Sequence, residues 1–466
     1  MRKNTAVSVK CVGAAPVARC PPVPPTGAGK EAVFTHNAPL PVYISHAARK
    51  PARLECGVCS QPDPLQRPAM ASDTSKGPRA RTTVFQQERA GGLTYRIPSL
   101  VHVPGGGVVL AFAEKRTTPD DTDAELLVLR RGRVNGRSVQ WLPVKELYCA
   151  TLPGHRTMNP CPVYERNSKT LFLFFICVLR KTSERHQICT GKNAARLCYV
   201  TSRDEGQSWS ELTDLTDGVL GERVDWATFA VGPGHGIQTA GGKLVVPAYA
   251  YQVHCRCFCF PLYVRPHAFY FYSTDGGGSW LVGQAVHRAS CECEMAEVMD
   301  REHRGHVYCN ARSTCGHRVE AVGNSDGTNF GKPRVARQLV EQHHGCQGSV
   351  VGFPAPKPDP GERNGASACL LDSPTWLLFS HPTDRRRRKN LGVYLNRRPL
   401  HESSWERLCV VNPGPSGYSD LAYCEEEGLF VCLVECGKKS EVEQIASLCF
   451  SLSDLLGATA AKTDTV

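Results

Sequence analysis

The chain has 466 residues, of which 41% are hydrophobic and 21% are charged, enough to form a large apolar core. Its formal net charge of +11 is concentrated near the N-terminus, because residues 1–81 carry 12 Lys and Arg against 4 Asp and Glu. The other residues are nearly neutral, which disfavours nucleic-acid binding by the folded part of the chain.

Residues 1–81 are rich in Pro, Ala, Lys and Arg, and we expect them to form a disordered extension. Lys10 and Arg19 interrupt the apolar run near the N-terminus, so a secretory signal is not expected. The longest apolar run, residues 171–179, is far short of the roughly 20 residues that a membrane-spanning helix needs. Without an export signal, the 23 cysteines are expected to be reduced thiols.

Two groups of cysteines have spacings that could suit metal ligands. Cys56 and Cys59 form a lone C-x-x-C without a second pair. Cys255, Cys257 and Cys259 alternate along CRCFCF, which would place all three on one face of a strand. Packed strand thiols are the favoured interpretation, and no phosphate-binding loop occurs in the sequence. We therefore expect no metal and no cofactor.

From residue 82 onward, short β-type runs alternate with Gly, Pro and Asp turns, as in GVVLAFAEKR, TLFLFFICVL and KLVVPAYAY. No long helical period is evident outside the extreme C-terminus. Many short strands with regular turn signals predict an all-β barrel, sandwich or propeller for residues 82–466. The Pro- and Gly-rich stretch 354–364 is expected to be a surface loop.

A repeated motif discriminates among these folds. The pattern S-x-D-x-G-x-x-W occurs at residues 202–209 and 273–280, with a degenerate copy at 324–330. Its chemistry is that of a tight hairpin turn, in which Ser and Asp bond the turn backbone, Gly takes the strained position and Trp anchors the turn. Recurrence at about 50 to 70 residues suits one four-stranded blade per unit. We expect the motif to be structural rather than catalytic.

One charge lies in an otherwise core-like strand, in the stretch T-Y-R-I-P-S-L. Tyr95 and Ile97 are core residue types, and Pro98 interrupts regular strand pairing. Arg96 is therefore expected to have a specific ligand. The planar guanidinium group is well suited to binding a carboxylate through two parallel hydrogen bonds.

YRIP followed by these repeated turns resembles the sialidase (neuraminidase) superfamily, over residues of roughly 82–455. AFAEKR, LPGHRTMNPCPV and GYSDLA resemble the animal cytosolic and plasma-membrane sialidases, and FLFFICV, EEEGLF and VECG are most similar to the plasma-membrane, ganglioside-cleaving branch. The resemblance implies a six-bladed β-propeller and a retaining exo-α-sialidase. The implied substrates are gangliosides, oligosaccharides and glycoproteins. A non-catalytic glycan-binding propeller and a trans-sialidase are the alternatives.

The resemblance also implies which arginines bind the carboxylate of sialic acid. Arg96 matches the first of three, Arg312 in N-A-R-S the second, and Arg388 the third. The third lies in a run of four arginines, so Arg386 is the alternative. Three guanidinium groups would neutralise the carboxylate and fix the orientation of the sugar ring.

By the same resemblance, Tyr418 in G-Y-S-D is the nucleophile, which is the family's exception to the usual two-carboxylate scheme of glycosidases. A neutral phenol approaches an anomeric carbon that carries a carboxylate with less repulsion than an anionic side chain would. The phenol needs a base to remove its proton. Glu292 matches that base, and the two competitors in E-C-E-M-A-E are Glu294 and Glu297.

The remaining implied site residues lie in several strands and loops. Asp121 matches the acid/base that protonates the leaving oxygen and then activates water, with Asp120 as the alternative register. Tyr249 and Tyr251 have i, i+2 spacing, so their rings share one face of a strand. The full set expected to line the sugar pocket is Arg116, Glu114, Asn159, Glu184, Tyr249, Tyr251 and Gln347.

The resemblance further implies sialylated glycolipids and glycans as binding partners and a peripheral association with the plasma membrane. The cytoplasm and the endosomal or lysosomal membranes are the alternative locations. The basic extension would add attraction to an anionic leaflet. The sequence does not indicate an oligomeric state.

Overall fold

The computed structural model describes residues 81–221, 225–255, 263–324, 329–357, 373–401 and 404–463. The predictions for residues 1–80, for the pair Cys56 and Cys59, for Cys257 and Cys259, and for most of the degenerate turn motif lie outside the described residues. Within those ranges no helix combines the length and the apolar character that crossing a membrane requires. The sixteen cysteines of those ranges form no disulfide.

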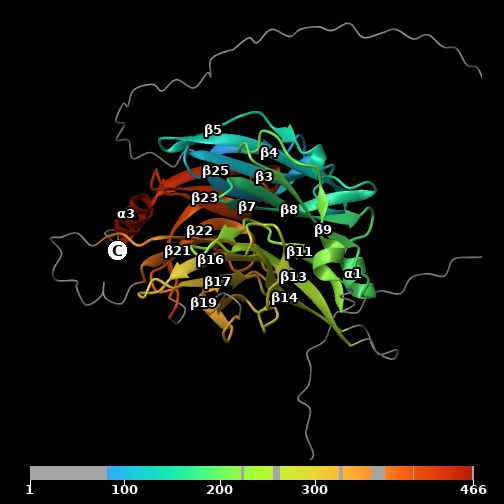
Figure 1. The fold of residues 1–466 in the computed structure, drawn as a ribbon. Coiled ribbons are helices and arrows are strands. Elements are labelled where there is room, and N and C mark those ends of the chain that lie inside the picture. The colour runs from blue at the N-terminus through green and yellow to red at the C-terminus, as the bar shows by residue number, and fades with distance from the viewer. Residues whose placement is uncertain are drawn as a thin grey trace, which may run out of the picture. The chain divides into compact units, whose positions relative to one another are not determined.

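Antiparallel blades follow one another along the chain and are arranged around a centre, as in a β-propeller (Figure 1). Blade 1 contains β2 (Thr94–Val103), β3 (Val108–Arg116), β4 (Ala124–Asn135), β5 (Ser138–Trp141) and β6 (Lys145–Glu146). Blade 2 contains β7 (His155–Glu165), β8 (Thr170–Leu179), β9 (Ala195–Ser202) and β10 (Thr213–Asp214). Blade 3 contains β11 (Trp226–Val231), β12 (Ile237–Gln238), β13 (Leu244–Cys255), β14 (Tyr263–Ser273) and β15 (Leu281–Val282).

In the last three blades, the long strand β23 belongs to blade 5 in its first half and to blade 6 in its second half. Blade 4 contains β16 (Cys293–Met299), β17 (Gly305–Ala311), β18 (His317–Val322) and β19 (Arg334–Val340). Blade 5 contains β20 (Ser349–Pro354), β21 (Thr375–Pro382), β22 (Lys389–Asn396) and the first half of β23 (Glu406–Cys424). Blade 6 contains the second half of β23, β24 (Leu429–Cys436), β25 (Gln444–Ser451) and β1 (Thr82–Gln86). Because β1 precedes blade 1 but pairs with β25, the first and last blades are held together.

The apolar run at residues 170–179 illustrates how the blades pack. It is β8, in which nine of ten residues are buried. Leu171, Leu173 and Phe175 pack with blade 1, whereas Phe172 and Phe174 pack with blade 3. Strand alternation thus sends successive side chains into two different inter-blade cores. That explains an uninterrupted apolar run in an antiparallel sheet.

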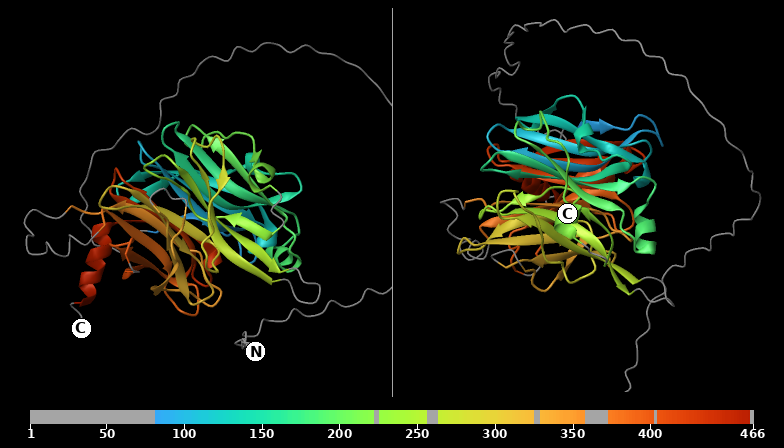
Figure 2. Two further views of the ribbon diagram at one scale, coloured as in Figure 1. Left: turned by 60° about the horizontal axis from the view of Figure 1, so that its bottom comes forward. Right: turned by 45° about the vertical axis from the view of Figure 1, so that its right-hand side comes forward.

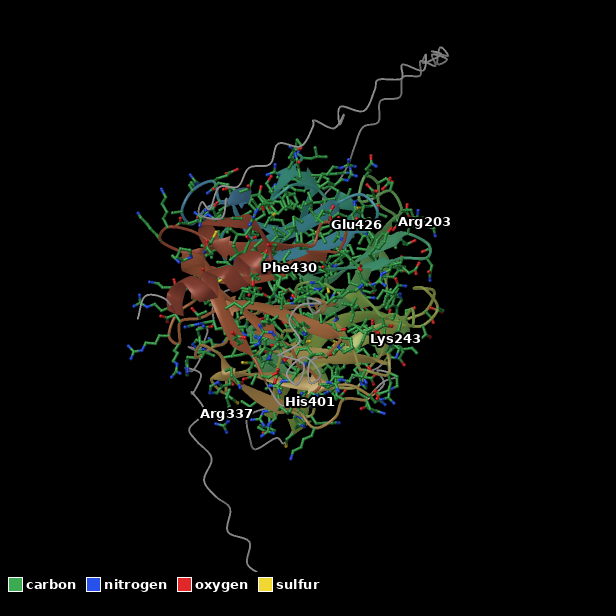
Figure 3. The ribbon with its side chains drawn as sticks, turned by 90° about the vertical axis from the view of Figure 1, so that its left-hand side faces the viewer. Arg203, Lys243, Arg337, His401, Glu426 and Phe430 are labelled. Carbon is green, nitrogen blue, oxygen red and sulfur yellow. The ribbon has the colours of Figure 1, made fainter. Side chains whose placement is uncertain are left out.

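Both complete copies of the repeated motif form the expected turn. In the first copy, the Ser202 hydroxyl accepts from the Gly206 N–H at 2.9 Å and donates to Asp204 Oδ1 at 2.8 Å, and Asp204 also accepts from the Ser208 N–H at 2.9 Å. The copy at 273–280 repeats these bonds, and Trp280 is buried. These bonds within the turn make the motif structural in both complete copies. Arg203 of the first motif is labelled in Figure 3, on the side of the molecule away from α1.

Helices in the described ranges are short. They are α1 (Glu184–Thr190), α3 (Leu452–Thr463) and single turns at η1 (Asp121–Asp123), η2 (Tyr148–Ala150), η3 (Thr216–Leu220) and η5 (Glu441–Glu443). The C-terminal helix α3 agrees with the sequence, and it lies at the rim of the molecule (Figure 2). Helix α1 was not predicted. It begins after Ser183, whose side chain accepts from the His186 N–H, and ends at Gly191 with a φ of +64°.

Candidate active site

A cavity of about 320 Å³ lies where inner strands of several blades converge. Its wall carries five guanidinium groups against three carboxyl groups, which suits an anionic ligand. These groups belong to Arg96, Arg116, Arg156, Arg312, Arg388, Asp121, Glu184 and Glu292. A larger cavity of about 650 Å³ has a separate wall, which includes Glu297, Tyr423 and Glu426 but none of the residues predicted to touch the sugar. Size therefore does not identify the site, whereas the chemistry of the wall does.

Three inner strands are irregular where they reach the smaller cavity. The pairing of β2 with β3 shifts after Arg96, where Ile97 has a φ of +60°. The pairing of β7 with β8 shifts around Asn159, whose φ is +57°. The pairing of β23 with β24 shifts around Tyr418. Such bulges turn a side chain out of the regular alternation, and here they direct Arg96, Asn159 and Tyr418 into the cavity.

A buried carboxylate fixes the first of these bulges. Glu435 of β24 accepts from Arg96 Nε at 2.7 Å, from the Ile97 N–H at 2.9 Å and from the Tyr418 N–H at 3.1 Å. Burial acts to raise the pKa of Glu435, but the charge of Arg96 outweighs it, and the pKa lies below the ordinary value. One carboxylate thus positions both Arg96 and the backbone of Tyr418. Glu435 was not predicted from the sequence. It is a charged residue in the apolar run LFVCLVEC, and a charge in a buried strand is the same signal that marks Arg96.

Tyr418 and Glu292 form a short hydrogen bond inside the cavity. The Tyr418 hydroxyl donates to Glu292 Oε1 at 2.5 Å, and Arg312 Nη1 donates to Glu292 Oε2 at 2.5 Å and to the Tyr418 oxygen at 2.9 Å. Burial, followed by the charge of Glu292, raises the pKa of Tyr418 well above the ordinary value. The phenol therefore keeps its proton at neutral pH, and Glu292 is the group placed to accept it.

The two competing glutamates lie elsewhere. Glu294 is fully buried and bonds to Gln347 and to the Val350 N–H. Glu297 lies on the wall of the larger cavity and accepts from the Ala240 N–H. Of the three glutamates in E-C-E-M-A-E, the structure brings Glu292 alone to Tyr418.

The arginine run contributes one side chain to the cavity wall. Arg388 is half-buried, and its guanidinium carbon lies 5.1 Å from the centre of the Tyr418 ring. The guanidinium carbon of Arg96 lies 5.9 Å from the same ring. Arg386 is exposed and is not part of the wall. Arg96, Arg312 and Arg388 therefore surround Tyr418. Of the two candidates for the third arginine, Arg388 lies at the cavity wall and Arg386 does not.

Asp121 reaches the cavity from η1, on the loop that follows β3. Its Oδ1 accepts from Arg116 Nη1 at 2.5 Å, and Arg116 is held in turn by Glu114 at 2.6 and 2.8 Å. Neighbouring protein atoms act to raise the pKa of Asp121 by partial desolvation, although its side chain is 68% exposed, but the charges of Arg116 and Arg96 outweigh this effect and the pKa lies below the ordinary value. Asp120 and Asp121 are both exposed, but only Asp121 is part of the cavity wall.

Comparisons with known proteins agree with this geometry. Residues 107–432 match the BNR repeat-like domain family. Sialidase-3 of Mus musculus is 50% identical over 397 residues, which cover 80% of this chain and 95% of that protein. Sialidase-4 of Homo sapiens is 42% identical over 455 residues, which cover 81% and 94%. The chain belongs to the animal sialidase family. It is an exo-α-sialidase, a glycoside hydrolase.

Solved structures confirm the fold. The Hadza microbial sialidase Hz136 superposes with a TM-score of 0.61 at 20% identity, over 78% of this chain and 67% of that chain. The intramolecular trans-sialidase from Ruminococcus gnavus superposes with a TM-score of 0.61 at 15% identity, over 80% and 98%. At these identities the likeness concerns the fold alone. The predicted six-bladed sialidase propeller is confirmed.

Two residues that were expected to contact the sugar in this sialidase are buried outside the cavity wall, and a third, Tyr251, is not part of the wall. Glu114 is fully buried and bonds to Arg116 and, at 2.7 Å, to the Asn159 N–H. Gln347 is also buried, and its side-chain oxygen accepts from the Ser419 N–H at 3.0 Å. Tyr251 packs its ring 6.1 Å from that of Tyr249 and is not part of the wall. Glu114 therefore holds Arg116 and the backbone of Asn159, and Gln347 holds the strand that carries Tyr418.

The wall also contains an arginine that the sequence analysis overlooked. Arg156 of β7 is buried, and it donates to the Leu179 carbonyl at 3.2 Å and to the Thr182 carbonyl at 2.8 Å. These bonds hold the segment that leads into α1, and so they help to place Glu184 at the cavity. As with Arg96, a charge within a buried strand was the available signal.

Glu184 is the wall residue whose charge is expected to change near neutral pH. Burial of the carboxyl group, followed by the charges of Glu292 and Asp121, raises its pKa to about 7. The residue as a whole is exposed, so water at the cavity mouth screens part of this repulsion. Since the carboxyl is neutral below that pKa and anionic above it, we expect KM for an anionic sialoside to rise several-fold between about pH 6 and pH 8.

The measurement is KM as a function of pH for the wild type and for Glu184→Gln. The variant cannot ionise, so its KM should stay flat across that interval. A KM rise of equal size in both proteins would show that another group is responsible.

Proposed function

We propose that this sialidase cleaves its substrates with retention of anomeric configuration, through a covalent intermediate on Tyr418, and that gangliosides are its preferred substrates. The observation that carries the first part is the 2.5 Å bond from the Tyr418 hydroxyl to Glu292, surrounded by three arginines. Because Glu292 already accepts a hydrogen bond from the phenol, it can remove the phenol proton while the Tyr418 oxygen attacks the sugar.

Binding precedes the chemistry. The carboxylate of sialic acid would bind to Arg96, Arg312 and Arg388, whose guanidinium groups all lie next to Tyr418. The carboxylate is attached to the anomeric carbon, so holding it beside Tyr418 also brings the carbon that reacts toward the phenol oxygen. Fixing both partners in this way removes most of the entropy cost of their encounter.

In the first step, the Tyr418 oxygen forms a bond to the anomeric carbon while its proton passes to Glu292. The bond from that carbon to the leaving oxygen breaks, and Asp121 in its protonated form supplies the proton that the leaving oxygen takes. The charges of Arg116 and Arg96 hold the pKa of Asp121 below the ordinary value. A bound carboxylate neutralises Arg96 and displaces water, and both changes raise that pKa.

In the second step, Asp121 accepts a proton from water, and the water oxygen attacks the anomeric carbon. The bond to Tyr418 breaks, and the phenol oxygen recovers its proton from Glu292. Each step inverts the anomeric carbon, so the two together retain its configuration. Arg312, which donates to both Tyr418 and Glu292, stabilises the negative charge that moves between them.

The preference for gangliosides is supported by the sequence resemblance and by the rim of the cavity. Leu179 is 49% exposed and directly follows Val178 of the cavity wall. At a lipid surface this side chain would bury apolar area against the acyl chains, which would favour a substrate presented there. The basic residues 1–81 would add attraction to an anionic leaflet, and the proposal includes a peripheral position on the plasma membrane. Release of sialic acid there would be a step in ganglioside catabolism.

The test compares gangliosides in anionic vesicles with a soluble sialylated glycoprotein. We expect kcat/KM to be roughly tenfold higher for the vesicle substrate, equivalent to about 1.4 kcal/mol, and the protein to sediment with the vesicles. Leu179→Ser should lower the vesicle rate without changing the rate on a small soluble sialoside. Equal rates on both substrates, with the protein left in the supernatant, would contradict the preference and the location.

A further inference from the structure

A buried cluster that the proposed mechanism does not use borders the larger cavity, whose wall includes the histidine of the cluster. It consists of His235, Glu294 and Asp420, whose possible ligand atoms all lie within 4.8 Å of one another. The exposed fractions are 8% for His235 and 0% for both acids. Glu294 is two residues beyond Glu292, and Asp420 is two residues beyond Tyr418. The cluster therefore lies between the two strands that present the proposed base and nucleophile.

Asp420 ties the strands of the site together. Its Oδ2 accepts from the Leu100 N–H of β2 at 2.6 Å, and its Oδ1 accepts from the Ser349 hydroxyl at 2.9 Å and the Leu421 N–H at 2.9 Å. His235 Nδ1 lies 2.7 Å from the same Oδ1, so the tautomer with its proton on Nδ1 donates to it. One carboxylate thus links β2, β20, β23 and the loop that carries His235.

Glu294 completes the cluster from β16. Its Oε1 accepts from Gln347 Nε2 at 3.0 Å, and its Oε2 accepts from the Val350 N–H at 3.1 Å and lies 3.6 Å from His235 Nδ1. Gly234 runs so close over this carboxyl that a Cβ there would lie 1.7 Å from Oε1. All four carboxylate oxygens of the cluster are thus engaged by protein donors, which is a poor arrangement for a metal ion.

If Glu294 and Asp420 were both ionised, two buried negative charges would repel each other. Burial, followed by the charge of Asp420, raises the pKa of Glu294 well above the ordinary value. The other titratable groups that face the pair are the thiols of Cys161 on β7 and Cys432 on β24, which burial keeps neutral by raising their pKa. His235 is the third titratable group beside the pair, with its Nδ1 2.7 Å from Asp420 Oδ1 and 3.6 Å from Glu294 Oε2.

We propose that Glu294, Asp420 and His235 are positioning residues for the sialidase reaction, and that a proton held between Glu294 and Asp420 keeps Glu292 and Tyr418 in register. When that proton leaves at alkaline pH, two like charges face each other without water. Their repulsion separates β16 from β23 and lengthens the bond from the Tyr418 hydroxyl to Glu292. This inference rests on the proposed roles of Tyr418 and Glu292, and it predicts an alkaline fall in kcat that belongs to Glu294 and is separate from the deprotonation of the acid Asp121.

The test is the pH profile of kcat for an aryl sialoside, whose acidic leaving group needs no proton from Asp121, measured on the full chain. Glu294→Gln stays neutral at every pH and retains a donor for Asp420. We expect its kcat at the optimum to lie within about threefold of wild type, and its alkaline fall to move upward by about one pH unit or more. Glu297→Gln is the matched control, since it makes the same change on the same strand but faces the larger cavity. Its profile should follow wild type.

A Glu294→Gln profile that falls at the same pH as wild type would overturn the proposal. If this variant fails to fold, infrared spectra of the wild type give a second measurement. The C=O band of a protonated carboxyl should persist at the pH of maximal kcat and disappear in step with kcat. Loss of the band well before kcat falls would also overturn the proposal. Neither measurement depends on which residue attacks the sugar, so the nucleophile assignment is tested separately.

Discussion

Replacing Tyr418 with phenylalanine is expected to lower kcat by a factor on the order of 10³ or more. The substitution removes one oxygen atom, which donates to Glu292 and accepts from Arg312, and leaves the ring in place. The three arginines remain, so KM should change by less than about tenfold. Loss of turnover with binding preserved is the pattern expected when a reacting atom is removed and the binding groups are kept.

Tyr423→Phe is the matched control, because it makes the same change on the same strand, at the end that borders the larger cavity. It should keep wild-type kcat, and both variants should show the wild-type unfolding transition. With a slowly hydrolysed sialoside, mass spectrometry of the wild type should find the sugar attached to the peptide that contains Tyr418. Near-normal kcat in Tyr418→Phe would rule out this residue as the nucleophile.

The strands were predictable because they depend on local chemistry. Alternation and turn residues mark each strand, and the motif at 202–209 contains every atom that its turn needs. Arg96 could be identified for the same reason. It is the one charged residue in the seven-residue stretch T-Y-R-I-P-S-L, where its neighbours Tyr95 and Ile97 are core residue types. Helix α1 was missed because seven residues are too few to show a helical period.

The supports of the site could not be read from the sequence, because they depend on pairing between distant strands. Glu435 meets Arg96 across 339 positions of the chain. Gln347 and Glu114 occupy positions that the family resemblance assigns to the pocket, yet their side chains point to the groups behind it. Nothing in a sequence states on which side of a bulge a side chain emerges, and a shift of one residue reverses that side.

The same limit applies to the acid/base, where two adjacent aspartates were candidates. Asp121→Asn is expected to lower kcat/KM by about 10² to 10⁴ on natural sialosides, whose leaving oxygen needs a proton. For an aryl sialoside with an acidic leaving group, the first step should be nearly unaffected. Asp120→Asn should remain within about twofold of wild type on both substrates, because Asp120 is exposed and lies off the cavity wall.

The second step distinguishes an acid/base from a group that only binds substrate. Without a carboxylate at position 121, no base activates water, so the covalent intermediate should accumulate. Asp121→Asn should then release one equivalent of aryl alcohol in a burst, followed by slow turnover. A uniform loss on both substrates without a burst would indicate that Asp121 only holds Arg116. A loss confined to Asp120→Asn would move the acid/base by one residue, onto a side chain that would have to turn from solvent into the cavity.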